Sequence, residues 1–276
     1  MMALAGWILA GLVVPSFAQT DAAAPEMTWT GVLDEEAFKA LHELREDSAP
    51  EPRGTTIDLA GGHAYLSVPD GEGPFPGIVI IHEWWGLNDH IRHWADRLAA
   101  DGYAAIAVDL YEGRIAAIPD DANAFMLTVG EDRAMEVLGA AFDFLASDER
   151  VKAPRRGCVG WCFGGGWSLR FAIAEPDLDA AVIYYGRLID DPEQLGKIQA
   201  EVCGIFGNLD QGIPPEQVSS FEKALAAANV THEIHRYDAN HAFANPSSGR
   251  YEQESAEAAW KVVRAFFARN LQTTAE

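Results

Sequence analysis

The stretch at residues 157–166, GCVGWCFGGG, constrains the fold of this chain more than any other segment. Cys162 stands two residues from Gly160 and two from Gly164, the G-x-C-x-G form of the G-x-S-x-G nucleophile elbow. Such an elbow turns sharply from a strand into a helix and needs residues without a β-carbon where the two come close. We therefore predict a strand, a strained turn that presents Cys162, and a helix that begins near Phe163.

The start of a helix suits a sulfur nucleophile. Its free N–H groups and dipole favour an anion, so they stabilise a thiolate at Cys162. A glycine-rich turn can instead bind a phosphate, but no G-x-G-x-x-G register fits and no Lys-Ser/Thr pair follows the glycines. A buried cysteine among packing glycines is the simpler alternative for this residue.

Length and composition bound the class of protein. The 276 residues, 49% of them hydrophobic, suffice for one α/β domain with a sizeable core. The formal net charge of −22 argues against a nucleic acid or an anionic membrane as a partner. Three cysteines are an odd count without C-x-x-C or a metal-ligand spacing, so we expect Cys158 and Cys203 to be core residues.

Metal and redox chemistry are the less favoured alternatives. His90 and His93 lie on the first turns of a predicted helix, without a third ligand within sequence reach. Cys158 and Cys162 could form a redox pair, but the first lies inside a predicted strand and the second on the turn after it. We expect no metal ion and no cofactor.

The chain begins with an apolar run at residues 3–18 that is short for a bilayer span and ends in Ser16-Phe17-Ala18. We interpret it as a secretory signal peptide cleaved after Ala18, with an uncleaved anchor as the alternative. The predicted organisation is a signal peptide at 1–18, a leader with a helix at 19–55, and one α/β domain at 56–276. This places the protein in the periplasm or outside the cell, without a stable membrane span after cleavage.

Strands and helices alternate after an edge hairpin predicted from residues 56–59 and 64–68. The further strands are predicted at residues 77–81, 103–108, 156–161, 180–184, 202–206 and 232–237. The helices are predicted at residues 34–46, 88–100, 132–146, 215–228 and 251–268, besides the helix after the elbow. This alternation predicts an α/β fold with a mostly parallel twisted sheet, helices on both faces, and ligands at the carboxyl ends of the strands.

Three reactive residues follow strands in this plan. Cys162, Asp210 and His241 come in the chain order of a nucleophile, an acid and a histidine in an α/β-hydrolase. His241 would accept the cysteine proton and later activate water, while Asp210 would fix its tautomer. For Asp210 alone, a turn aspartate is the alternative. Trp84 and Trp85 indicate either core packing or a pocket wall, and their place after a central strand favours the wall.

With these residues assembled, the sequence resembles the dienelactone hydrolase family of α/β-hydrolases over about residues 56–268. The resemblance rests on several motifs in one order: residues 82–88 (HEWWGLN), 109–111 (DLY), 157–166, 184–186 (YYG), 207–214 and 241–243 (HAF). It implies the triad Cys162, Asp210 and His241. It further implies that the Glu83 carboxylate contacts the resting thiol and moves away when substrate binds, and that the backbone N–H groups of Trp84 and Phe163 form the oxyanion hole.

The resemblance also points to substrate-binding residues, namely Tyr111, Trp85, Tyr185, Arg114 and Asn245. Founding members of the family hold the substrate carboxylate with two arginines. Arg114 corresponds to the first of these, whereas Asn245 stands at the second position, and Arg187 is a candidate substitute. We therefore expect a broader ester hydrolase than one confined to dienelactone.

The sequence thus predicts a secreted or periplasmic, monomeric, cysteine-dependent hydrolase of small carboxylic esters or lactones. The reaction would pass through a thioester acyl-enzyme on Cys162. A non-catalytic secreted binding protein that retains the fold is the second hypothesis, and it predicts a thiol no more reactive than a free cysteine.

Overall fold

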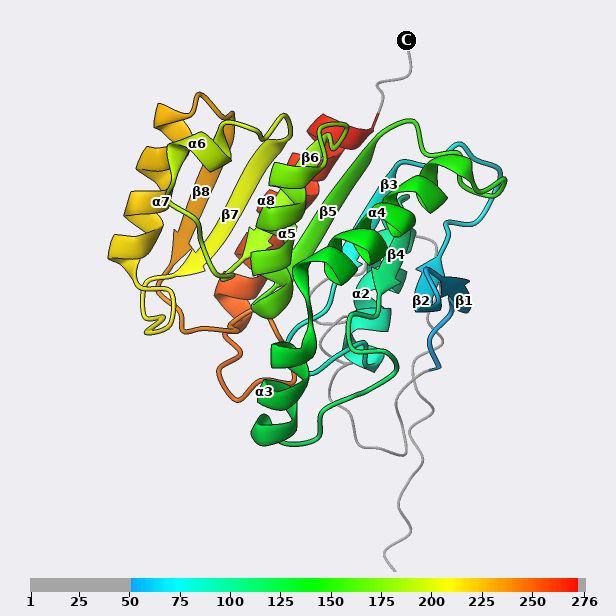
Figure 1. Cartoon of the computed structure of the whole chain (residues 1–276), viewed down its shortest axis with the longest axis horizontal. Coiled ribbons are helices and arrows are strands. Elements are labelled where there is room, and N and C mark those ends of the chain that lie inside the picture. The colour runs from blue at the N-terminus through cyan, green and yellow to red at the C-terminus, as the bar shows by residue number, and fades with distance from the viewer. Residues whose placement is uncertain (1–50, 273–276) are drawn as a thin grey trace, which may run out of the picture.

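The computed structural model describes residues 51–272, in which helices cover both faces of one eight-stranded sheet (Figure 1). The strands are β1 (Thr55–Leu59), β2 (Gly62–Ser67), β3 (Gly77–Ile81), β4 (Ala104–Val108), β5 (Arg156–Trp161), β6 (Ala180–Tyr184), β7 (Glu201–Gly207) and β8 (His232–Tyr237). The helices are α2 (Asp89–Ala100), α3 (Pro119–Thr128), α4 (Glu131–Ser147), α5 (Phe163–Ala174), α6 (Pro192–Leu195), α7 (Pro215–Ala227) and α8 (Gln253–Leu271). The expected signal peptide and the helix at residues 34–46 lie outside the described residues.

The strand order is β1-β2-β4-β3-β5-β6-β7-β8. β1 and β2 form the predicted antiparallel hairpin at one edge, and β2 is also antiparallel to β4. From β4 onward every pairing is parallel. The carboxyl ends of six strands therefore meet at one edge of the sheet, which confirms the mostly parallel sheet and brings the loops after these strands together.

Two hydrophobic clusters fill the space between the sheet and its helices. One cluster joins the sheet to α4, α5 and α7, and the other joins it to α2 and α8. In β3, Ile78 and Ile80 belong to one cluster while Val79 and Ile81 belong to the other, because successive side chains of a strand point to opposite faces. The uninterrupted apolar sequence of this strand is thus explained by burial on both faces.

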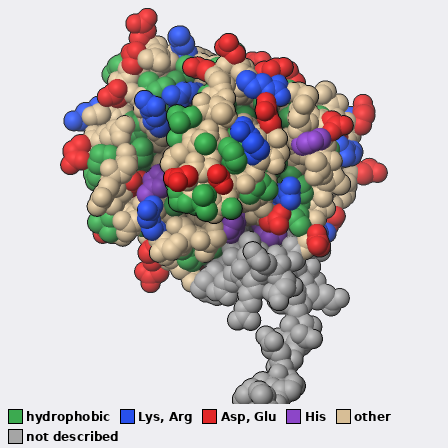
Figure 2. Space-filling model, turned by 60° about the horizontal axis from the view of Figure 1, so that its bottom comes forward, with side chains coloured by type: hydrophobic (Ala, Val, Ile, Leu, Met, Phe, Trp, Pro, Cys, Tyr) green, Lys and Arg blue, Asp and Glu red, His purple; other side chains and the backbone are tan. Residues whose placement is uncertain are grey.

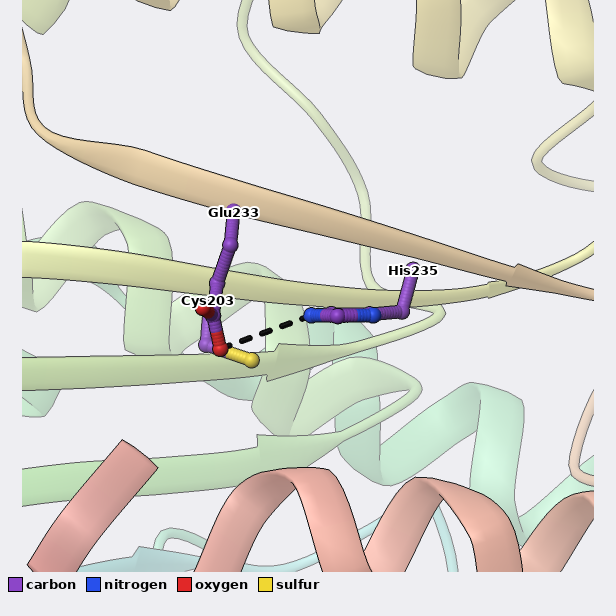
Figure 3. A group of neighbouring side chains, drawn as sticks. All are labelled: Cys203, Glu233 and His235. Carbon is purple, nitrogen blue, oxygen red and sulfur yellow. Dashed lines mark ion pairs between the residues drawn. The ribbon is translucent and has the colours of Figure 1, made fainter. Parts of the chain in front are cut away.

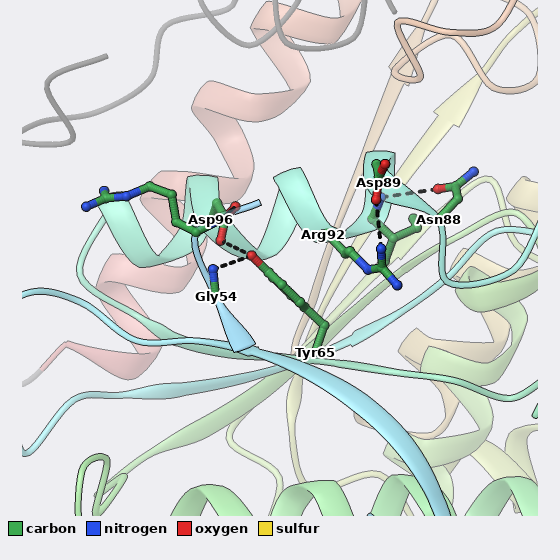
Figure 4. Close-up of polar contacts among 8 residues, drawn as sticks. Gly54, Tyr65, Asn88, Asp89, Arg92 and Asp96 are labelled. Carbon is green, nitrogen blue, oxygen red and sulfur yellow. Dashed lines mark hydrogen bonds and ion pairs between the residues drawn. The ribbon is translucent and has the colours of Figure 1, made fainter. Parts of the chain in front are cut away.

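A polar network fixes the edge hairpin to α2 (Figure 4). The buried Asp96 carboxylate in α2 accepts hydrogen bonds from the hydroxyls of Tyr65 and Ser67, both at 2.7 Å, and from the Arg53 N–H at 2.9 Å. The Tyr65 hydroxyl also accepts a hydrogen bond from the Gly54 N–H. Since each buried polar group is paired, the network holds the hairpin without an unsatisfied carboxylate.

Two helices were not predicted from the sequence. α3 buries only Ala122, so its sequence carries no apolar periodicity to reveal it. α6 has four residues, which is too short for a periodic pattern. The other elements predicted within residues 51–272 lie where they were predicted, with ends that shift by up to three residues.

The surface agrees with the acidic composition. Figure 2 turns the bottom of Figure 1 forward and shows Asp and Glu side chains spread around the visible face, with Lys and Arg between them. No helix within residues 51–272 is both long and apolar enough to cross a membrane.

Candidate active site

Cys162 lies on the predicted strained turn between β5 and α5. Its φ of 54° and ψ of −112° lie in a region that non-glycine residues rarely adopt. A β-carbon on Gly160 would stand 2.1 Å from the Gly164 carbonyl oxygen, and one on Gly164 would stand 2.2 Å from the Ile81 carbonyl oxygen. The two flanking glycines are therefore required by close backbone contacts, and the elbow is confirmed as a structure.

Asp210 and His241 meet in the loops after β7 and β8. The Nδ1 atom of His241 lies 2.6 Å from Oδ2 of Asp210. The other oxygen, Oδ1, accepts hydrogen bonds from the N–H groups of Gly212 at 2.8 Å and Ile213 at 3.0 Å. Burial favours the neutral carboxyl, but the hydrogen bonds and the charge of His241 outweigh it and lower the pKa of Asp210. Asp210 is thus a fixed anion that orients the imidazole.

The second nitrogen of His241 is left for Cys162. Burial acts to lower the pKa of His241, but its hydrogen bonds to Asp210 and Cys162, with the charges of both, raise that pKa to about 10. The imidazolium form is therefore stabilised between a carboxylate and a sulfur. The structure brings these three side chains together from three loops far apart in the chain.

Glu83, in the loop after β3, is a buried carboxyl beside this group. Its Oε2 accepts a hydrogen bond of 2.5 Å from Nδ2 of Asn245, and the Tyr185 hydroxyl lies 3.5 Å from Oε1. Burial raises the pKa of Glu83, and the Asn245 hydrogen bond, the charge of His241 and the Tyr185 contact offset part of this. Among residues 51–272 we find no hydrogen bond between this carboxylate and the Cys162 thiol, so Asn245 and Tyr185 hold it in the present conformation.

His82 was missed as a site residue by the sequence analysis. Its Nδ1 lies 2.6 Å from the Glu83 carbonyl oxygen, and its Nε2 lies 3.1 Å from the backbone N of Leu110. Because the Leu110 N–H can only donate, Nε2 must accept and Nδ1 must carry the proton. Full burial lowers the pKa of His82 and keeps the ring neutral. The imidazole thus connects the loops after β3 and β4.

The two expected oxyanion-hole donors lie in the loop after β3 and at the start of α5. Phe163 is the first residue of α5, so its N–H has no acceptor within the helix. Trp84 follows Glu83 in the loop after β3, and its ring packs edge-to-face on Trp85 at a centroid distance of 5.1 Å. In the part of the chain described here, neither N–H donates a hydrogen bond to another backbone group.

These groups line a cavity of about 840 Å³. The lining includes six residues singled out from the sequence: Glu83, Trp84, Trp85, Cys162, His241 and Asn245. It also includes the exposed Arg250, which the sequence analysis did not consider and which borders a second hollow beside Asp210 as well. Trp85 is thus a wall of the cavity, as predicted for this tryptophan pair.

The remaining substrate-binding candidates lie further from the cavity. Arg114 donates from Nε to the Tyr111 carbonyl at 2.8 Å and from Nη2 to Oγ1 of Thr128 at 2.9 Å, and its guanidinium lies over Phe125. It borders a smaller hollow instead of the main cavity. Arg187 is exposed and is not among the residues that line the cavity.

The two tyrosines among these candidates are buried. Tyr111 packs on Phe163 at a centroid distance of 5.4 Å, and its hydroxyl has no hydrogen-bond partner among the described residues. Tyr185 lies beside His241, with ring centroids 5.1 Å apart, and has a positive φ of 34°.

The two histidines and two cysteines that the sequence analysis set aside are buried away from this cavity. His90 and His93 lie in α2, and Cys158 and Cys203 lie in β5 and β7. The prediction that Cys158 and Cys203 are buried in strands is confirmed. All three cysteines are free, so the alternative pairing of Cys158 with Cys162 is not formed.

The sequence of this chain is similar to those of known proteins. Residues 63–271 match the dienelactone hydrolase family. The chain is 34% identical to a "Putative carboxymethylenebutenolidase" of Escherichia coli (strain K12), over 77% of this chain and 85% of that protein. A protein of the same name from Methylorubrum extorquens is 32% identical, over 74% of this chain and 75% of its own length.

A solved structure has the same fold. The crystal structure of a "Putative Dienelactone Hydrolase" from Klebsiella pneumoniae matches with a TM-score of 0.72 and 32% identity. The match covers 78% of this chain and 97% of that chain. The predicted α/β-hydrolase fold is therefore confirmed.

Proposed function

The chain belongs to the dienelactone hydrolase family, and on this basis we propose that it hydrolyses small carboxylic esters or lactones through a thioester on Cys162. The observation that carries the proposal is the 2.6 Å contact between His241 and Asp210, with the other side of the imidazole hydrogen-bonded to Cys162. A nucleophile, a base and an orienting carboxylate in this relation can perform acyl transfer.

In the first half of the proposed reaction the Cys162 thiolate attacks the substrate carbonyl carbon. The carbonyl oxygen becomes an anion and accepts hydrogen bonds from the N–H groups of Trp84 and Phe163, each worth about 3 kcal/mol in such sites. The imidazolium of His241 then gives its proton to the leaving oxygen as the carbon–oxygen bond breaks. An alcohol leaves, or the ring of a lactone opens, and the acyl group remains on sulfur.

In the second half the now neutral His241 takes a proton from water, and the resulting hydroxide attacks the thioester. The tetrahedral intermediate uses the same two N–H donors and collapses with cleavage of the carbon–sulfur bond. The acid departs, and the thiolate and the imidazolium are restored. Asp210 keeps the imidazole in the tautomer that faces the sulfur in both halves.

Glu83 is proposed to be a reversible partner of the nucleophile. Its carboxylate contacts the Cys162 thiol in the resting enzyme and moves away when substrate enters, as the family resemblance implies. The thiol then gives its proton to His241, which yields the thiolate and the imidazolium that begin the reaction. The hydrogen bonds to Asn245 and Tyr185 would hold the displaced position. In this account Asn245 acts chiefly on Glu83 instead of on the substrate.

The cavity supports the proposed substrate class. Trp84 and Trp85 offer apolar walls, and Arg250 supplies a cation at its border. Such a cation would favour esters or lactones that carry a carboxylate. Tyr111, Tyr185 and Arg114 are proposed to shape this region from behind the lining.

We further propose that the enzyme acts as a monomer in the periplasm or outside the cell. The location rests on the apolar run at residues 3–18 and its Ser16-Phe17-Ala18 end. The catalytic domain would then correspond to residues 56–276, which contain the matched residues 63–271.

The function is tested by turnover of a short-chain aryl ester by the wild type, Cys162→Ala and Cys158→Ala. Cys158 is a matched control because burial raises the pKa of its thiol to about 12, so it stays neutral and unreactive. We expect Cys162→Ala to lose at least about three orders of magnitude in kcat, and Cys158→Ala to retain most activity. Full activity of Cys162→Ala would reject the proposed function.

A further inference from the structure

A second group of reactive side chains lies on the sheet, on β7 and β8. Cys203 stands directly opposite Glu233 in the strand register, and His235 follows two residues later on the same face of β8. A sulfur, a carboxylate oxygen and an imidazole nitrogen of these residues all lie within 4.8 Å of one another. Figure 3 shows the Glu233 and His235 side chains reaching from β8 toward Cys203 on β7.

The polar atoms of this group are incompletely satisfied. Nε2 of His235 is buried and has no hydrogen-bond partner within the described residues, although it lies 3.4 Å from Oε1 of Glu233. Arg269 contacts the other oxygen, Oε2, at 3.4 Å, which leaves Oε1 directed toward the histidine. The side chains of His235 and Glu233 are 33% and 30% exposed, so ions can reach them from solvent.

We propose that Cys203, Glu233 and His235 form a binding site for a divalent transition-metal ion, with zinc as the ion that fits best. A thiolate, an imidazole and a carboxylate are the three ligand types that zinc takes in proteins. Magnesium and calcium prefer oxygen ligands alone, so the sulfur and nitrogen select against them. Three protein ligands leave the fourth tetrahedral position for water.

A metal ion bound at this site would stabilise the sheet. Cys203 lies near the start of β7, whereas Asp210 follows the end of that strand. β8 is the edge strand of the sheet, and none of its residues is fully buried. A bound ion would fasten this strand to β7, and the loops after these two strands carry His241 and Asp210. The ion would therefore stabilise the folded protein by mass action, without taking part in the reaction.

Metal binding must replace the proton of the Cys203 thiol. Burial and the neighbouring Glu233 charge hold the pKa of Cys203 well above its usual range, so the free thiol is neutral at pH 7. The sulfur–hydrogen bond breaks, the proton goes to solvent and a sulfur–metal bond forms. Binding accordingly tightens as pH rises.

The test is titration of the metal-free full chain with cobalt(II), which reports a thiolate ligand by sulfur-to-cobalt charge-transfer absorption. Because Cys162 and His241 could also bind cobalt, every variant carries Cys162→Ala. We expect the Cys162→Ala protein to bind one ion per chain with this absorption. Adding Cys203→Ser or His235→Gln should weaken binding by at least about 100-fold. This is the upper end of the range for residues that only hydrogen-bond to metal ligands, and loss of a direct ligand should cost at least as much.

His232→Gln is the matched control, because His232 is also a β8 histidine but lies on the opposite face of the sheet. It should leave the cobalt affinity unchanged. Zinc should also raise the Tm of the Cys162→Ala protein but not that of Cys162→Ala/Cys203→Ser. If the Cys203 variant folds poorly by circular dichroism, Glu233→Gln takes its place. Charge-transfer absorption that persists without Cys203, or its absence from the Cys162→Ala protein, would overturn the proposal.

Discussion

Nδ1 of His82 lies 2.6 Å from the carbonyl oxygen of Glu83, on one side of a peptide whose other side carries the Trp84 N–H. The C=O and N–H of a trans peptide point in opposite directions. The imidazole that holds the Glu83 carbonyl therefore also fixes the direction of the Trp84 N–H, one of the proposed oxyanion donors. We therefore infer that His82 is a positioning residue for the proposed oxyanion hole.

Replacing His82 should lower kcat with little change in KM, since the oxyanion exists only along the reaction path. We expect His82→Phe to lose about 100-fold in kcat, the range for loss of one oxyanion donor. His82→Asn, whose amide N–H can stand near the place of Nδ1, should lose less. Steady-state kinetics of both variants, with the rate of Cys162 alkylation as a control for the thiol, checks this. Equal losses in the two variants would show that the donated hydrogen bond is unimportant.

The elbow glycines give a prediction on stability. Gly164→Ala would place a β-carbon 2.2 Å from the Ile81 carbonyl oxygen and should destabilise the fold by about 1–3 kcal/mol. Gly139→Ala, in α4 with open space around the added carbon, should instead stabilise it by about 0.5–1 kcal/mol. Urea unfolding of both variants measures the difference. A Gly164→Ala protein as stable and active as the wild type would contradict the packing described for the elbow.

The pKa of His241 predicts how stability depends on pH. It rises from an ordinary 6.5 to about 10 in the folded protein. The interactions that raise this pKa add to the free energy of unfolding. Their contribution is fully present below pH 6.5 and is lost as pH rises toward 10. The free energy of unfolding of the wild type should fall across this range more than that of His241→Gln. Parallel pH profiles of the two proteins in urea unfolding would argue against a stabilised imidazolium form of His241 in the folded protein.

Arg250 should determine selectivity for charged substrates. Arg250→Ala is expected to raise KM by about 10-fold or more for an ester with a carboxylate on its acid portion, because one charge-assisted hydrogen bond is lost. KM for the neutral ester of similar size should hardly change. Arg114→Ala serves as the comparison, since its guanidinium is engaged by Tyr111 and Thr128. If Arg114→Ala alone removes the selectivity, the carboxylate binds on that side instead.

The sequence predicted those features that depend on local pattern. The strand before Cys162 lies where its apolar run placed it, because burial of nearly all its residues leaves a clear signature. The strand before His241 also lies at its predicted residues, although none of them is fully buried. α3 escaped prediction because it lies on the surface with almost no buried face. Local sequence pattern thus predicts the elements that pack into the core and misses those that bury almost no side chains.

Features that depend on contacts between distant segments could not be predicted from the sequence. The role of His82 requires the loops after β3 and β4 to touch through Leu110, and Arg250 borders the cavity only once its loop is folded. Likewise, Cys203 and His235 are far apart in sequence and become neighbours through the register of two strands. Such contacts follow from topology and register, which no spacing along the chain encodes directly.

The central claim is that the acyl group resides on the Cys162 sulfur during turnover. The most direct measurement is mass spectrometry of the enzyme, quenched in acid during turnover of a short-chain aryl ester and digested into peptides. We predict an added acyl group on the peptide that contains Cys162, released by hydroxylamine and absent from Cys162→Ala. Rapid ester turnover with that peptide unmodified, or the acyl group on another residue, would contradict the account.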